Sequence, residues 1–144
     1  MDNADNPQKY EKVINECAMY NLRRLSRLTT NNLNHKLAAT GMRCTQYSIL
    51  LAAGARPGST MTVLSEYLGM DISTLTRSTE NLEHLGFIRF EFGTHREKYV
   101  YLTEDGDKKI DEAEPIWQQE QQNFIDAFGQ DAWEACLKAI AKYN

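Results

Sequence analysis

The chain has 144 residues, 42% hydrophobic and 25% charged, which is typical of a globular domain rather than a disordered or fibrous chain. It contains no apolar run near the ~20 residues that a membrane-spanning helix needs. Its N-terminal stretch lacks the apolar core of a signal peptide, so we expect a cytoplasmic protein with no membrane partner. The net charge is −4, but residues 1–44 carry +3 and residues 103–144 carry −6. Any nucleic-acid contact would therefore depend on local basic positions.

The N-terminal region, residues 8–37, has apolar residues at mostly helical spacing. This pattern predicts one long amphipathic helix with a bend or break at residues 29–32, where two threonines and two asparagines follow one another. Gly41 is expected to end this region as a helix C-terminal glycine. Thr45 is then expected to cap a helix over residues 45–55.

Two shorter helices and a hairpin are predicted next. A helix opened by Thr62 ends at Gly69, and a hydroxyl-rich helix follows Asp71 and stops at Gly86. Beyond Gly86 the apolar period changes from 3.6 to 2 in two aromatic runs, which flank a glycine-bearing turn. This pattern predicts a β-hairpin over residues 87–102.

The last part of the chain is predicted to be helical. Thr103 with the acidic residues after it caps a helix to about Phe128, with a kink expected at Pro115, and Gly129 separates it from a final amphipathic helix. The predicted fold is therefore mainly α with a small β-hairpin wing. A winged helix-turn-helix core at residues 45–106 is flanked by amphipathic helices at residues 1–44 and 107–144, in one compact domain. The apolar stripes of these flanking helices need a partner, and we expect them to serve dimerisation through a twofold contact.

The hydroxyl-rich helix suggests a nucleic-acid interface. On a helical wheel, one side carries Leu75, Ser78, Thr79, Leu82 and Leu85, which we expect to pack on the preceding helices. The other side carries short polar groups and a cation, and such groups can reach phosphates and base edges in a DNA major groove. The candidate DNA-binding residues on this helix are Ser73, Thr74, Thr76, Arg77 and Asn81. The alternative is an ordinary solvated face, although solvated faces usually favour better helix formers.

The hairpin turn offers a second contact. Arg96 lies at the turn, with His95 before it and Lys98 just after it. A protruding hairpin can place an arginine in the minor groove beside a major-groove helix. The alternative is an ordinary surface turn with an ordinary arginine, but the predicted helix-turn-helix before the hairpin favours the DNA contact.

The motif "LSEYLGMDISTLTRSTENLEHLGFI" (residues 64–88), with Arg96 and "VYLTEDG" (residues 100–106), resembles the MarR family of winged-helix transcriptional regulators. The resemblance covers nearly the whole chain and implies a homodimer on a pseudopalindromic double-stranded DNA operator. It places Arg96 at the family's wing arginine. The family usually has an aspartate two residues earlier, where this chain has Thr94, and Glu91 and Glu97 are the candidates for that acidic role.

Three kinds of switch are open to such a regulator. The OhrR group within this family carries a sensing cysteine on its first helix, which makes Cys17 a candidate for redox sensing, although a free cysteine is more often a small buried apolar residue. The family also implies a pocket for a small aromatic or phenolic effector, with candidate lining residues Tyr20, Arg24, Met42 and Tyr47. No spacing of histidines, cysteines and acids indicates a metal site, and no cofactor is expected.

The leading hypothesis is a homodimeric DNA-binding repressor that a ligand or an oxidant releases from its operator. The alternative is a winged-helix module that binds protein instead of DNA, which the acidic net charge would suit. An enzyme is not expected, because the sequence has no GxSxG, phosphate-loop or HExxH motif.

Overall fold

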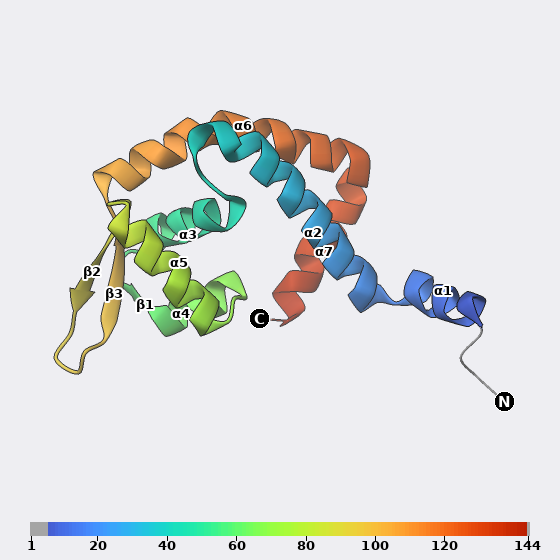
Figure 1. Cartoon of the computed structure of the whole chain (residues 1–144), viewed down its shortest axis with the longest axis horizontal. Coiled ribbons are helices and arrows are strands. Elements are labelled where there is room, and N and C mark those ends of the chain that lie inside the picture. Colours follow the sequence, from blue (N-terminus) through green and yellow to red (C-terminus); the bar gives the residue numbers. More distant parts are fainter. Residues whose placement is uncertain (1–5, 144) are drawn as a thin grey trace.

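The computed structural model describes residues 6–143 and contains long helical arms around a small winged core (Figure 1). In chain order the elements are α1 (Pro7–Glu16), α2 (Ala18–Leu37), the short 3₁₀ helix η1 (Ala38–Thr40), α3 (Cys44–Ala55), β1 (Ser59–Thr60), α4 (Met61–Leu68), α5 (Ile72–His84), β2 (Ile88–Phe92), β3 (Lys98–Leu102), α6 (Glu104–Phe128) and α7 (Gln130–Tyr143). The mainly helical fold with a small wing is thus confirmed. Within residues 6–143, no helix combines the length and apolar character that crossing a membrane requires.

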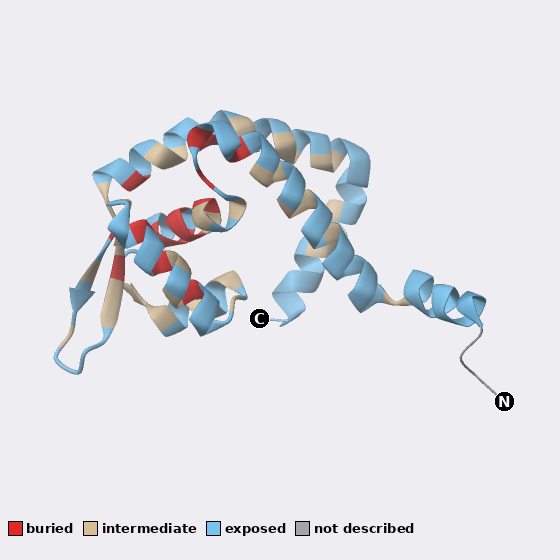
Figure 2. Cartoon of the chain, viewed as in Figure 1, coloured by how far each residue is buried: buried red, intermediate tan, exposed pale blue. Residues whose placement is uncertain are grey.

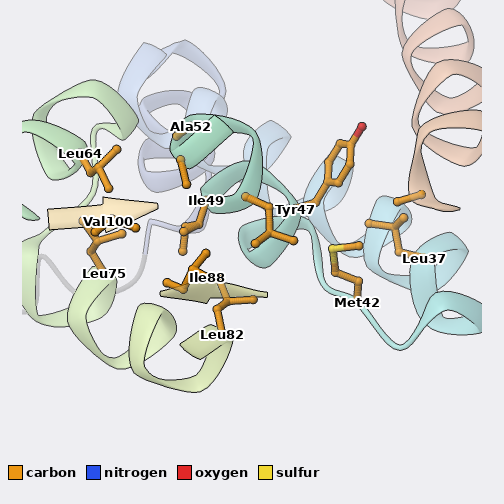
Figure 3. Packing of buried hydrophobic residues seen from close by; sticks show 13 residues of the cluster. Leu37, Met42, Tyr47, Ile49, Ala52, Leu64, Leu75, Leu82, Ile88 and Val100 are labelled. Atoms are coloured by element: carbon orange, nitrogen blue, oxygen red, sulfur yellow. The ribbon is translucent and has the colours of Figure 1, made fainter. Parts of the chain in front are cut away.

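The hydrophobic core lies within the winged part and centres on α3 (Figure 2). Figure 3 shows side chains from α4, α5 and both hairpin strands converging on this helix. Leu64, Leu75, Leu82 and Val100 are all fully buried there. Burial of apolar surface stabilises a fold by ~25 cal/mol per Å², so these side chains are the main stabilising contribution to the core.

The sheet has three antiparallel strands in the order β1-β3-β2. The hairpin pairs Phe90 with Val100, as the alternating pattern predicts, and β1 adds Ser59 on the other side of Val100. Strand β1 was not predicted, because a two-residue strand is too short to show a period of two.

The predicted break in the N-terminal helix is wrong in position. The helix is continuous through residues 29–32, where the Thr29 hydroxyl donates back to the Leu25 carbonyl at 3.0 Å. The interruption falls at Cys17 instead. There the Asn21 side-chain amide donates to the carbonyls of Ile14 (2.9 Å) and Asn15 (3.2 Å), which lie in the last turn of α1, where carbonyls lack an intrahelical partner.

Two predicted helix starts are also shifted. α3 begins at Cys44 rather than Thr45, because the Asn34 side chain of α2 accepts a hydrogen bond from the Cys44 amide at 2.8 Å. α4 is capped by Thr60 rather than Thr62. The predicted ends at Gly41 and Gly69 are confirmed, since both adopt left-handed backbone with φ of 70° and 62°.

The wing is connected to α6 through Thr103. Its hydroxyl donates to the Gly86 carbonyl at 2.6 Å and accepts from the Gly106 amide at 3.0 Å, which confirms its predicted capping role. Gly106 is buried against the start of the wing, and a Cβ there would lie 2.0 Å from the Phe87 carbonyl oxygen. α6 continues through Pro115 without interruption.

Candidate DNA-binding surface

The buried side of α5 fixes which of its residues face outward. Leu75, Thr79 and Leu82 are fully buried, and the Thr79 hydroxyl is satisfied by the Leu75 carbonyl at 2.9 Å. Leu85, predicted on the buried side, is 49% exposed because it lies at the C-cap, where the helical wheel no longer applies. Thr74 and Arg77 lie on the exposed side, and Thr76 is half-buried.

The start of α5 is occupied by its own acidic cap. Asp71 Oδ1 accepts from the Ser73 hydroxyl at 2.6 Å and from the Thr74 amide at 2.8 Å. These bonds, the Ser73 hydroxyl foremost, hold the pKa of Asp71 well below its usual range. This carboxylate already accepts hydrogen bonds at the N-terminus of α5, and its negative charge would repel a phosphate there. The Ser73 hydroxyl is likewise bonded within the chain.

Asn81 is connected sideways to α3. Its Oδ1 accepts from Gln46 Nε2 at 3.0 Å, and Gln46 Oε1 in turn accepts from the Arg43 amide at 2.9 Å. Asn81 therefore helps to hold α5 in orientation on the core. The role of Gln46 was not predicted, because a contact between residues 35 positions apart leaves no local pattern.

The wing lies directly beside α5, since α5 and β2 pack against each other (Figure 1). Lys98 at the start of β3 reaches Glu80 of α5 at 4.0 Å and lies 4.8 Å from the centre of the Phe90 ring. This ion pair connects the hairpin to α5 at the surface, and Glu80 is a second residue whose contact the sequence did not predict.

The hairpin turn is closed by backbone bonds rather than by an acidic side chain. The Gly93 amide donates to the Glu97 carbonyl at 2.9 Å, and Arg96 adopts left-handed backbone with φ of 62°. Glu97 accepts from the Tyr99 hydroxyl and Glu91 pairs with Arg89, so neither acid pairs with Arg96 in place of the family aspartate at Thr94. His95 and Arg96 are exposed at the tip.

Five cationic side chains lie in residues 45–102, and they divide into two groups. Arg56 stacks on Tyr67, Arg89 stacks on Tyr101, and Lys98 pairs with Glu80. Arg77 and Arg96 make no ion pair and no cation–π contact within this fully described stretch. These two free cations belong to the exposed side of α5 and to the hairpin tip.

The four residues predicted for an effector pocket lie in different environments. Met42 and Tyr47 belong to the core cluster, whereas Tyr20 and Arg24 are exposed on α2. Burial, together with the charge of Glu114, raises the pKa of the Tyr47 hydroxyl. A cavity of about 460 Å³ lies between α2, α6 and α7, and none of the four lines it. An effector site at these four residues stays a prediction.

The cysteines are separate free thiols. Cys17 is half-buried at the break between α1 and α2, where its sulfur accepts from the Tyr20 amide at 3.4 Å. Burial raises the pKa of Cys44, which lowers its reactivity as a thiolate. In the described part of the chain, no three histidine, cysteine or acidic side chains come together as metal ligands would.

The winged arrangement has relatives among known regulators. The M. tuberculosis transcriptional regulator MosR in complex with DNA is 30% identical, with 89% of this chain and 93% of that chain covered and a TM-score of 0.78. The uncharacterised HTH-type transcriptional regulator YwoH of Bacillus subtilis is 28% identical over 100 residues, which cover 69% of this chain and 73% of YwoH.

A MarR-family transcriptional regulator from Rhodococcus sp. RHA1 shares the fold at 20% identity, with 84% of this chain and 87% of that chain covered and a TM-score of 0.73. No protein-family model matches the chain. These relatives are transcriptional regulators, not enzymes. Together with the winged core, they establish that the chain belongs to the MarR family of winged helix-turn-helix transcriptional regulators.

Proposed function

We propose that the chain is a homodimeric repressor that binds a pseudopalindromic double-stranded DNA operator and leaves it when a small molecule binds. The observation that carries the DNA-binding part is the pair of free cations, Arg77 on α5 and Arg96 at the hairpin tip. Their guanidinium groups are available to acceptors outside the chain, such as the phosphates and base edges of DNA. MosR, at 30% identity, has been crystallised with DNA.

The proposed contacts divide by role. Thr74 and Arg77 enter the major groove, while His95 and Arg96 approach the adjacent minor groove. The Thr76 hydroxyl donates to the Ile72 carbonyl at 2.7 Å, so Thr76 offers DNA chiefly its methyl group, which can contact a thymine methyl. Ser73, Asn81 and Lys98, which we also predicted as DNA-binding residues, have partners within the chain and primarily hold this surface in shape. The acidic net charge is compatible with this function because the acids of residues 107–144 lie beyond the winged core.

The proposed dimer uses residues 1–44 and 107–144. Val13 and Leu22 on the N-terminal helices are more than half exposed, and Ile140 on α7 is 51% exposed. Apolar surface of this extent needs a cover, and a twofold contact between identical copies is the commonest one. Twofold symmetry would place two α5 helices about one turn of DNA, ~34 Å, apart. A repressor of this kind acts on the chromosome, so we place it in the cytoplasm.

The test is a selection of bound fragments from genomic DNA of the source organism, followed by fluorescence-anisotropy titration of the enriched sequence. We expect an inverted repeat with half-sites one DNA turn apart, and an affinity that falls steeply as salt rises. Absence of binding even to random duplex at low salt would refute DNA binding and would favour the alternative of a winged-helix module that binds protein.

A further inference from the structure

The cavity between α2, α6 and α7 has aromatic walls. Trp117 and Phe124 come from α6 and Trp133 from α7, with Leu28 of α2 on the opposite side. Phe124 packs edge-to-face against Trp133 with ring centroids 6.0 Å apart. The volume of about 460 Å³ falls in the ~300–1,000 Å³ range of small-molecule sites.

Glu120 supplies the one charged side chain among the residues that line this cavity. Asn32 Nδ2 donates to one carboxylate oxygen, and Asn123 Nδ2 donates to the other at 3.1 Å. Within residues 6–143, no lysine, arginine or histidine forms an ion pair with it. A carboxylate has about four acceptor positions, so two amides orient this one and leave capacity for a further donor.

An orientated carboxylate beside two indole rings is suited to a cation. Tryptophan is the best aromatic partner for an ammonium group, and a charge-assisted hydrogen bond to the carboxylate would add to that attraction. An anion would meet the negative charge of Glu120 and no compensating cation in the lining. The charge therefore argues against phenolic carboxylates as ligands of this cavity.

We propose that this cavity binds an aromatic amine in its cationic form, with the ammonium group on Glu120 and the ring against Trp117 and Trp133. As the effector site of a repressor, this inference rests on the proposed function. α6 supplies the connection, because one of its ends walls the cavity and the other begins at Thr103, next to the wing.

The chain carries its own reporter, since its two tryptophans both line the cavity. The test is a titration of tryptophan fluorescence in the full-length protein with three probes of similar size: phenethylamine, 2-phenylethanol and 3-phenylpropionate. We expect phenethylamine to bind roughly tenfold more tightly than the neutral alcohol, and the anionic acid to bind most weakly. Equal or tighter binding of the acid, or no fluorescence response to any probe, would overturn the proposal.

Two variants localise the effect. Glu120→Gln should abolish the preference for the amine over the alcohol, whereas Asp111→Asn, which removes a charge from an exposed position on the same helix, should retain it. An unchanged preference in Glu120→Gln would also overturn the proposal. The comparison of probes on the unmodified protein keeps the test decisive if Glu120→Gln does not fold.

Two further measurements test alternatives to an effector site. Tryptophan emission on dilution shows whether the cavity is a dimer contact, and DNA binding with and without phenethylamine shows whether the cavity affects DNA affinity. If a second copy of the chain fills the cavity, tryptophan emission will change on dilution through dimer dissociation while no probe binds, and the proposal is wrong. DNA binding is first measured without any probe. If the protein does not bind DNA in that measurement, the proposed function is refuted, but the proposal that the cavity binds an aromatic amine is not. DNA binding that persists unchanged at saturating phenethylamine would refute the effector role.

Discussion

The winged core and the helical arms differ in how they bury their apolar residues. α3 alone contributes five buried residues to the core, whereas no residue of α1 or α7 is buried. Yet the arms are not polar, because Val13, Leu137 and Ile140 are each at least 47% exposed. We therefore expect the core to be stable within one chain, and we expect the arms to depend on a partner copy that covers their apolar surface.

The largest expected effect is a cavity in the core. Leu50→Ala should lower the free energy of unfolding by about 2–5 kcal/mol, because Leu50 is fully buried in α3. Leu51→Ala is the matched control, since its side chain is 40% exposed, and it should cost less than about 1 kcal/mol. Urea denaturation measures both, and equal losses would refute the assignment of the core to this face of α3.

An arm substitution should act on association instead. Ile140→Lys places a charge on the exposed apolar face of α7 and should raise the dissociation constant of the dimer by roughly tenfold or more. Ala135→Lys adds the same charge on the opposite face of the helix and should change it little. Sedimentation equilibrium measures both constants, and a chain that stays monomeric without any substitution would contradict the dependence of the arms on a partner.

The contact between α3 and α5 should have a smaller effect. A double-mutant cycle of Gln46→Ala and Asn81→Ala should give a coupling of about 0.5–1 kcal/mol, because the two side chains share one exposed hydrogen bond at 3.0 Å. If the two substitutions have additive effects on the free energy of unfolding, Gln46 and Asn81 do not stabilise each other, and the Asn81 side chain remains available for DNA.

The acidic cap of α5 should appear in the pH dependence of stability. The pKa of Asp71 is lower in the folded chain than its unfolded value of about 3.9, so its stabilising contribution is complete above that pH. It is lost as pH falls from about 4 toward the folded value. Asp71→Asn keeps a good cap but does not titrate, and it should therefore lose less stability over this range; identical acid profiles would count against the cap.

Local signals predicted most of the fold. The change of period at Gly86, the cap at Thr103 and the left-handed glycines at Gly41 and Gly69 each depend on neighbouring residues only. The break at Cys17 was missed because it depends on where the Asn21 side chain turns back to the end of α1.

The candidate surface was predictable in its elements but not in its internal contacts. The pattern of residues 73–85 identified the exposed helix, and the contact of Ser73 with the Asp71 cap is local. The contacts of Asn81 and Lys98, by contrast, depend on residues that only the fold brings close. The partners of Asn81 and Lys98 lie 35 and 18 positions away in the sequence. Such contacts decide which polar groups remain available to DNA.

The most direct test of DNA binding through this edge is an anisotropy titration of the selected operator with three arginine variants. Arg77→Ala and Arg96→Ala should each weaken binding by roughly tenfold and reduce its salt dependence, because each removes a free cation from the proposed DNA-binding edge. Arg56→Ala removes the same charge from a side chain stacked on Tyr67 and should stay within about twofold of the unmodified protein. Losses that are equal for all three variants, or unaltered binding by the first two, would contradict the role of Arg77 and Arg96 as the cations that hold DNA.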